Sequence, residues 1–153
     1  MFMTAKEYLQ QAYKLDQRIN HDLEEVARLR EMATSLSSPS FGERVQSSPD
    51  GNAAFVTSVE AIIKLEQKIN KEIDLLVALK EQIHDVLSRV SDTDEYIVLW
   101  YRYVDGLSWE RISLKTHVSV SAAYKRHAKA LKSVVLPDNP ICIKKPEVFF
   151  ETR

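Results

Sequence analysis

Two stretches of apolar residues at helical spacing, each too long to bury itself, constrain the fold most strongly. From Thr4 to about Ser35 the spacing predicts one helix, which Thr4 and Glu7 would start as a capping box. Its inward stripe consists of Tyr8, Ala12, Leu15, Ile19, Leu23, Val26, Leu29 and Ala33. At ~1.5 Å per residue this rod is about 45 Å long, so it needs a partner helix to cover the stripe.

A second rod is predicted from Asn52 to about Val90. Its apolar positions are close to a heptad: Phe55, Val59, Ile62, Ile69, Ile73, Leu76, Ile83, Leu87 and Val90. Four further residues widen this seam: Ile63, Leu65, Leu79 and Val86. A contact between two helices needs a narrower seam. We therefore expect the second rod to contact more than one helix, through dimerisation or docking of the C-terminal region.

An internal repeat predicts that the rods fold back on each other around a Ser- and Pro-rich loop at 36–52. The segment Leu15–Leu23 resembles Leu65–Ile73. An antiparallel pairing of the repeats would bring together Ile19 and Ile69, Leu15 and Ile73, and Leu23 and Leu65. Asn20 and Asn70 would then either form a buried pair that fixes the register or lie exposed beside the seam.

The pattern changes after Ser91, where shorter helices are predicted. Ser91–Asp94 would cap a helix that reaches Val104 and is rich in aromatic residues. Trp100 and Trp109 are expected to supply the core of this small region, and stacking of either ring on a base is the weaker alternative.

Asp105-Gly106 predicts a turn, because glycine tolerates a positive φ. Ser108 would cap a short helix from about Trp109 to Lys115, and 116–118 is a break. Ser119 or Ser121 would cap a second helix that reaches roughly Val134. Its inward positions are expected to be Val118, Ala123, Ala130 and Leu131.

Charge gives the functional prediction. The whole chain has a net charge of −1, yet no Asp or Glu occurs between Arg111 and Lys132. A helix of one sign is typical of phosphate binding, whereas a solvated surface helix usually carries both signs. The residues predicted to face base edges are Ser121, Ala122, Tyr124 and Lys125. Those predicted to contact phosphates are Arg111, Lys115, Arg126, Lys129 and Lys132, together with the helix N-terminus at Ser119.

Residues 96–112 resemble region 4 of sigma-70-type factors. In that family an apolar helix ends in an Arg-Tyr-x-(Asp/Glu)-Gly turn, as at Arg102–Gly106, and Ser-aromatic-Glu-x-Ile follows, as at Ser108–Ile112. The segment Val118–Ser121 is similar to the start of the recognition helix of the family. Later matches are Arg126, Ala130 and Leu131, and the departures are His127, where an aliphatic residue is usual, and Ala122-Ala123 in place of Thr-Val. The resemblance covers about the last third of the chain and implies a helix-turn-helix that contacts DNA and RNA polymerase.

Nearly all of the chain also resembles small regulators of prophages and mobile elements that are related to the RinA and ArpU late-gene activators. The loop sequence, Ser-Ser-Pro-Ser-Phe-Gly-Glu-Arg-Val-Gln-Ser-Ser, is the most specific part of this match. It implies a transcription factor that activates phage or prophage late or packaging genes. The alternative is a protein-interaction factor that binds RNA polymerase or another host or phage protein. A purely structural coiled-coil adaptor would leave the basic segment unexplained.

The expected architecture is therefore all-α, with a long antiparallel helical hairpin over 1–90 that serves as a coiled-coil dimerisation stem. A three-helix, sigma region 4-like helix-turn-helix domain over 91–136 and an extended tail over 137–153 follow. Double-stranded DNA and a second copy of the chain are the expected partners. The operator, the choice between activation and repression, and the oligomer count are left open.

Composition argues against other classes of protein. The single cysteine, Cys142, suits a reducing compartment, and the chain has no apolar run for a membrane span and no signal peptide. We thus expect a cytoplasmic protein of a bacterial host. The scattered histidines fit no metal site, and no catalytic or phosphate-loop motif occurs, so neither catalysis nor a cofactor is expected.

Overall fold

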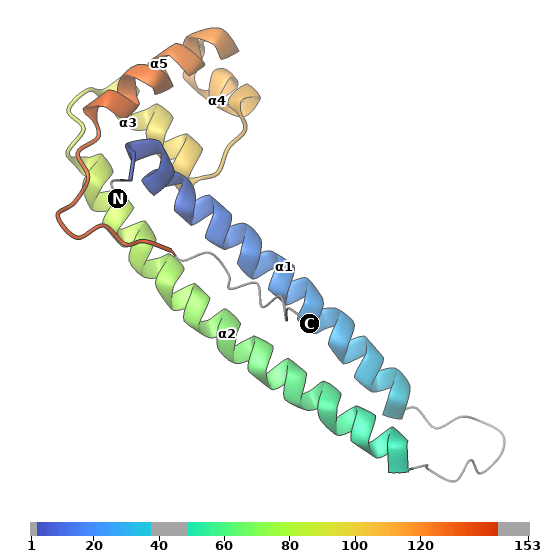
Figure 1. Ribbon diagram of the computed structural model, residues 1–153. Coiled ribbons are helices and arrows are strands. Elements are labelled where there is room, and N and C mark those ends of the chain that lie inside the picture. Colours follow the sequence, from blue (N-terminus) through green and yellow to red (C-terminus); the bar gives the residue numbers. More distant parts are fainter. Residues whose placement is uncertain (1–2, 38–48, 144–153) are drawn as a thin grey trace, which may run out of the picture. The chain divides into compact units, whose positions relative to one another are not determined.

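The structure, a computed structural model, describes residues 3–37 and 49–143. These residues form helices and no strand, which confirms the all-α class. The elements are α1 (Ala5–Ser37), α2 (Pro49–Ser88), α3 (Thr93–Leu99), a π-helical turn η1 (Trp100–Val104), α4 (Trp109–Thr116) and α5 (Val120–Ser133) (Figure 1). Among the described residues, no helix is long and apolar enough to cross a membrane.

The chain packs as two compact units. One unit is Asp16–Leu76, and the other combines Met1–Leu15 with Val77–Arg153. The end of α2 therefore belongs to the same unit as the C-terminal helices. We call Asp16–Leu76 the stem unit and the other the head unit.

The ends of the long helices follow local rules. At the start of α1 the Thr4 N–H donates to Glu7 Oε2 (2.9 Å), and the Glu7 N–H donates to Thr4 Oγ1 (3.2 Å), which confirms the capping box. The predicted loop was too long at both ends, because α1 continues to Ser37 and α2 begins at Pro49. Proline suits a first helical position, where its missing N–H would have no acceptor. Residues 38–48 lie outside the described residues.

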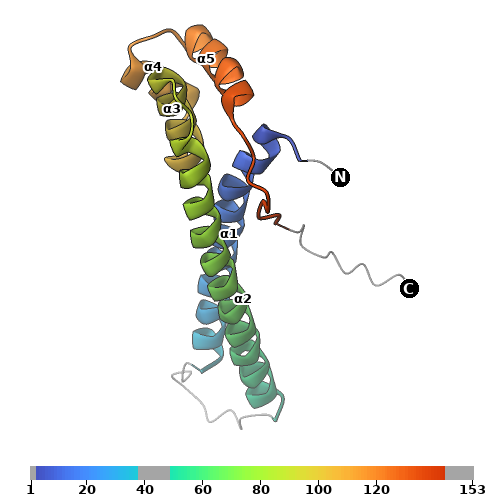
Figure 2. The same cartoon turned by 90° about the vertical axis from the view of Figure 1, so that its left-hand side faces the viewer.

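In the stem unit, α1 and α2 run side by side in opposite directions (Figure 2). The apolar residues that they bury are Ile19, Val26, Ala33, Ile62, Ile69 and Leu76. Leu23 and Ile73 were wrongly predicted to be inward, since they are 48% and 39% exposed. The stripes are too wide for a single partner, so one edge of each stripe remains uncovered.

The predicted pairing of Ile19 with Ile69, Leu15 with Ile73 and Leu23 with Leu65 stays a prediction. The ion pair of Lys68 with Asp22 (3.2 Å) joins the two helices near the level of Ile19 and Ile69. Asn20 and Asn70 are both exposed, which agrees with the alternative in which they lie beside the seam rather than form a buried pair.

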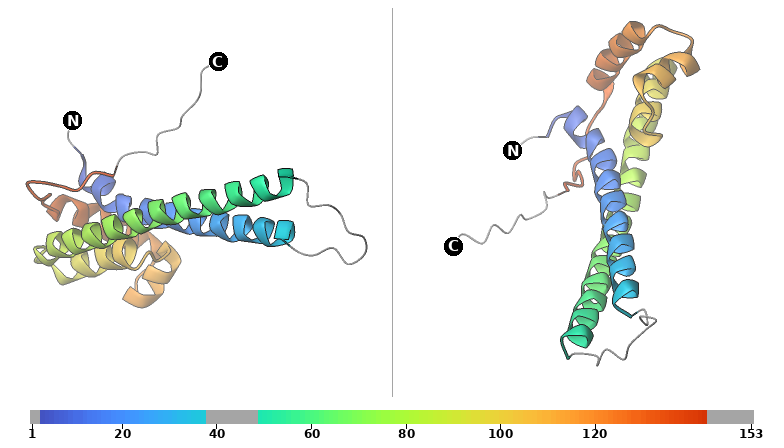
Figure 3. Two further views of the ribbon diagram at one scale, coloured as in Figure 1. Left: turned by 90° about the horizontal axis from the view of Figure 1, so that it is seen from below. Right: turned by 90° about the vertical axis from the view of Figure 1, so that its right-hand side faces the viewer.

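In the head unit, α5 packs across α3 and α4 (Figure 3). The centre of this packing is a fully buried cluster of Val98, Ile112 and Ala123, covered by Tyr101, Leu107, Trp109 and Val118. Trp109 is therefore part of the core, as predicted. Trp100 instead lies edge-to-face on His84 of α2, with 5.2 Å between the ring centroids. Apolar residues at the start of α1 and the end of α2 complete the unit: Tyr8, Leu9, Leu79, Ile83 and Leu87.

After α5, residues 134–143 contain no helix and pack within the head unit on two glutamines, and the rest of the predicted tail, 144–153, lies outside the described residues. The Gln82 side chain accepts from the Ile141 N–H (2.9 Å) and donates to the Asn139 carbonyl (3.0 Å). The Gln11 side chain donates to the Ile141 carbonyl (2.9 Å) and accepts from the Ile143 N–H (2.8 Å). Each amide thus pairs with the tail backbone as a neighbouring strand would.

Replacing Gln82 with leucine is expected to speed amide hydrogen exchange at Ile141 about tenfold. The change removes the acceptor of that N–H, and a hydrogen bond of this kind contributes roughly 1 kcal/mol. Replacing Gln11 with leucine should speed exchange mainly at Ile143, whose N–H donates to the Gln11 side chain. Exchange measured by NMR would test both variants, with Gln67→Leu on the exposed side of α2 as a control. Unchanged exchange at both amides would contradict the glutamine contacts.

Candidate nucleic-acid interface

Tight turns at both ends of α4 set the path into α5. Gly106 has φ +67°, which confirms the predicted turn, and Ser108 Oγ accepts from the Arg111 N–H (3.3 Å). At the other end His117 adopts a left-handed conformation with φ +56°, and the Ser113 hydroxyl donates to the Val118 carbonyl. Ser119, rather than Ser121, caps α5 by accepting from the Ala122 N–H (3.1 Å).

One face of α5 is buried and the opposite face is open. Ala123, His127 and Ala130 are buried. At about 100° per residue, the side opposite them carries the exposed residues Ser121, Tyr124, Lys125, Ala128, Lys129 and Lys132. We call these six residues the α5 outer face. Of the four residues predicted to face bases, Ala122 is half-buried at the edge, whereas Ser121, Tyr124 and Lys125 belong to the α5 outer face.

The remaining predicted phosphate contacts flank this face. Arg111 and Lys115 are exposed on α4, and Arg126 is half-buried on α5. The Lys115 ammonium lies 5.2 Å from the centre of the Tyr101 ring, and this cation–π contact favours one orientation of the Lys115 side chain. Ser119 stands at the start of α5, where the N–H groups of a first helical turn point outward without intrahelical acceptors.

An aromatic stack supports the α5 outer face, and sequence reasoning missed it. The Tyr124 ring lies on Trp109, with 4.4 Å between centroids, and the Arg102 guanidinium lies over Trp109 at 4.8 Å. Tyr124 is nevertheless half-exposed. Its ring is held in one orientation, so its hydroxyl can meet a ligand at little entropic cost. No local pattern links these three residues, because they come from three different elements.

Beneath the α5 outer face lies a buried polar pair. Tyr103 Oη and His127 Nε2 are 2.6 Å apart. Burial, followed by the charges of Lys6 and Arg102, lowers the pKa of His127 to about 4. Burial, opposed by Arg102, raises the pKa of Tyr103 to about 12. Both groups are therefore neutral near pH 7, and the tyrosine hydroxyl donates to the imidazole nitrogen.

An acid also lies under this helix, although the segment itself contains none. Glu95 of α3 is buried and accepts from the Ser133 hydroxyl (2.7 Å). Its other oxygen is 3.9 Å from Lys129 Nζ, while the Lys129 side chain is 78% exposed. Lys129 can therefore turn outward to a phosphate. Its charge is partly balanced by Glu95, which sequence order alone did not predict.

The arrangement offers cations and hydroxyls on one exposed face of a helix. Among the described residues, no group of three His, Cys, Asp or Glu side chains could hold a metal ion. No family model matches the chain, and neither a curated protein nor a solved structure is similar to it.

Proposed function

We propose that this chain is a sequence-specific DNA-binding transcriptional regulator whose α4 and α5 form a helix-turn-helix. One observation carries the proposal: the α5 outer face is cationic and exposed on a helix fixed by Ser119, His117 and a fully buried core. Its three lysines lie on one side of α5 over about two turns. A convex helix of this kind fits the major groove of B-DNA, which is about 12 Å wide.

Each part of the interface has a distinct role in this proposal. Ser121 and Lys125, near the start of α5, face base edges, and the small Ala128 allows close approach. Lys129, Lys132, Arg111 and Lys115 contact phosphates. Tyr124, held by Trp109, donates its hydroxyl to the backbone or to a base. The further role as an activator of phage or prophage late genes depends on the resemblance to the RinA and ArpU regulators.

Single substitutions of Lys125 and Lys129 test the two roles. Lys125→Ala is expected to weaken binding to the cognate operator by roughly tenfold or more and to affect random duplex less. Lys129→Ala should weaken binding to both duplexes equally and lower the salt slope by about one. Titration of both variants at two salt concentrations, with an operator selected from random sequence, would measure this.

The control for both variants is Lys71→Ala, which removes an exposed lysine from α2. Equal losses on operator and random duplex for Lys125→Ala would reject its role in reading bases. If wild-type protein binds no duplex at low salt, the proposed function itself is wrong.

A second candidate function is binding to RNA polymerase. Tyr96, Ile97, Trp100 and Tyr101 are half-buried and line a groove on α3 and η1. Aromatic residues are frequent in protein interfaces. A gel shift with the upstream DNA of the gene separates the two functions. Binding without polymerase favours the first function, and binding only in its presence favours the second.

A further inference from the structure

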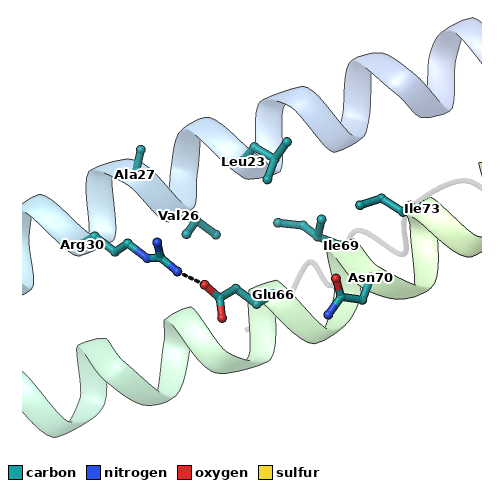
Figure 4. Close-up of a pocket in the computed structure, with 8 residues that line it drawn as sticks. All are labelled: Leu23, Val26, Ala27, Arg30, Glu66, Ile69, Asn70 and Ile73. Carbon is teal, nitrogen blue, oxygen red and sulfur yellow. Dashed lines mark hydrogen bonds and ion pairs between the residues drawn. The ribbon is translucent and has the colours of Figure 1, made fainter.

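One side of the stem unit carries an open apolar groove. Leu23, Val26 and Ala27 of α1 and Ile69, Asn70 and Ile73 of α2 line it, and the ion pair of Arg30 with Glu66 spans the two helices there (Figure 4). Further along the same side of α2 are two more exposed apolar residues, Val56 (53%) and Ile63 (48%). We define the stem groove face as Leu23, Ala27, Val56, Ile63, Asn70 and Ile73.

The opposite side of the same helices carries charged side chains that form ion pairs with one another. Lys68 Nζ lies 3.2 Å from Asp22 Oδ2 and 3.6 Å from Glu72 Oε1, and both carboxylates are buried. This side has its own ionic partners within the chain. The stem groove face instead presents half-exposed branched side chains to water, which is unfavourable for a chain that remains alone.

The spacing on α2 is that of a second helical seam. Val56, Ile63 and Asn70 recur every seven residues, and Val59 and Ile73 lie three residues after such positions. This seam is distinct from Ile62, Ile69 and Leu76, which pack within the chain. β-branched residues with a single asparagine at one position of a heptad are typical of a helix that pairs with another helix in a fixed register.

The dimensions of the face suit a dimer. The helix from Val56 to Ile73 is about 25 Å long, and two adjacent helices of about 10 Å make the face about 20 Å wide. It therefore offers on the order of 500 Å² per chain, or roughly 1,000 Å² for a pair, which reaches the size of a specific interface.

We propose that a second copy of this chain covers the stem groove face, so that two antiparallel helix pairs form a four-helix stem with Asn70 at the contact. The charged residues that line the groove among the described residues are Arg30 and Glu66, which neutralise each other within one chain. A face without unbalanced charge is complementary to itself, as a twofold interface requires. Asn70 contributes register rather than affinity.

Charged residues placed on the face should separate the copies. In Ile63→Lys/Ile73→Lys the lysines would have to be desolvated in the interface, so the dissociation constant of the dimer should rise by roughly 100-fold or more. Both positions are exposed within one chain, so far-UV circular dichroism should remain unchanged. The matched control is Met32→Lys/Leu75→Lys, which adds the same charge at exposed apolar residues outside the groove. Sedimentation velocity over a concentration series measures all three proteins.

Asn70→Ile provides a second test, in which self-association is expected to strengthen rather than weaken. It should tighten self-association and allow larger species, because an apolar residue replaces the polar one in the seam. A wild-type chain that stays monomeric throughout the series would overturn the proposal and leave the face to another protein. A dimer that survives Ile63→Lys/Ile73→Lys, or that the control disrupts equally, would also overturn it. None of these outcomes bears on DNA binding by the α5 outer face.

Discussion

Replacing Lys125, Lys129 and Lys132 together with alanine is expected to weaken binding to duplex DNA by about 100-fold at physiological salt. The three ammonium groups lie on one exposed side of α5, and each contact with DNA phosphate releases condensed cations into solution. The slope of log affinity against log salt should therefore fall by about two to three. Fluorescence anisotropy with labelled duplex over a series of salt concentrations would measure both quantities.

The matched control for this variant is Lys64→Ala/Lys71→Ala/Lys80→Ala. These three lysines are exposed on α2, so the control changes the net charge by the same amount. Its affinity and slope should remain close to those of the wild type if the α5 outer face is the binding surface. Equal losses in the two triple variants would mean that binding depends on overall charge, and the interface assigned to α5 would be wrong.

Acidification is expected to destabilise the head unit through His127. Its pKa is about 4 in the folded protein, well below the ordinary value of 6.5, so the unfolded chain takes up a proton that the folded chain excludes. The stability that neutral His127 contributes is present above the unfolded pKa and is lost as the pH falls toward the folded pKa. Between about pH 7 and about pH 5 this loss amounts to about 2 kcal/mol.

Variants of the buried pair isolate this effect from the titration of carboxylates. Tyr103→Phe should lower the free energy of unfolding by roughly 1–2 kcal/mol, because it leaves His127 Nε2 without its donor in a buried place. Tyr103→Phe/His127→Leu removes both partners, so it should regain most of that loss and flatten the pH dependence. Urea denaturation followed by tryptophan fluorescence at several pH values would measure these differences. A double variant with the same pH dependence as the wild type would show that another group is responsible.

Local signals in the sequence predicted the helices and their ends well. Thr4 and Ser108 cap helices, and Gly106 adopts a positive φ. Each of these features depends only on residues nearby in the sequence. The outward direction of Lys125 followed from helical spacing alone. The uncovered edge of each wide stripe was not predictable in this way, because Leu23 and Ile73 satisfy the same period as the residues that are buried.

Long-range contacts account for the other differences. Leu9 is fully buried but lies beside the predicted stripe, because the start of α1 packs in a unit that also contains C-terminal residues. Trp109 and Tyr124 meet across two helices, and Glu95 approaches Lys129 from a third. The widened turn at Trp100–Val104 depends on the Asp105 N–H donating to the Trp100 carbonyl, five residues earlier, which no residue preference indicated.

The two glutamines have a consequence for the order of assembly. Gln11 holds the backbone of Ile141 and Ile143, which follow it by 130 and 132 positions in the chain. Helical contacts within Asp16–Leu76 connect residues already present, so this unit can form during translation. The contact of Gln11 with Ile141 in the head unit instead joins residues 130 positions apart in the chain, and such closures are slow. A nascent chain can thus form its stem unit before this contact closes in the head unit.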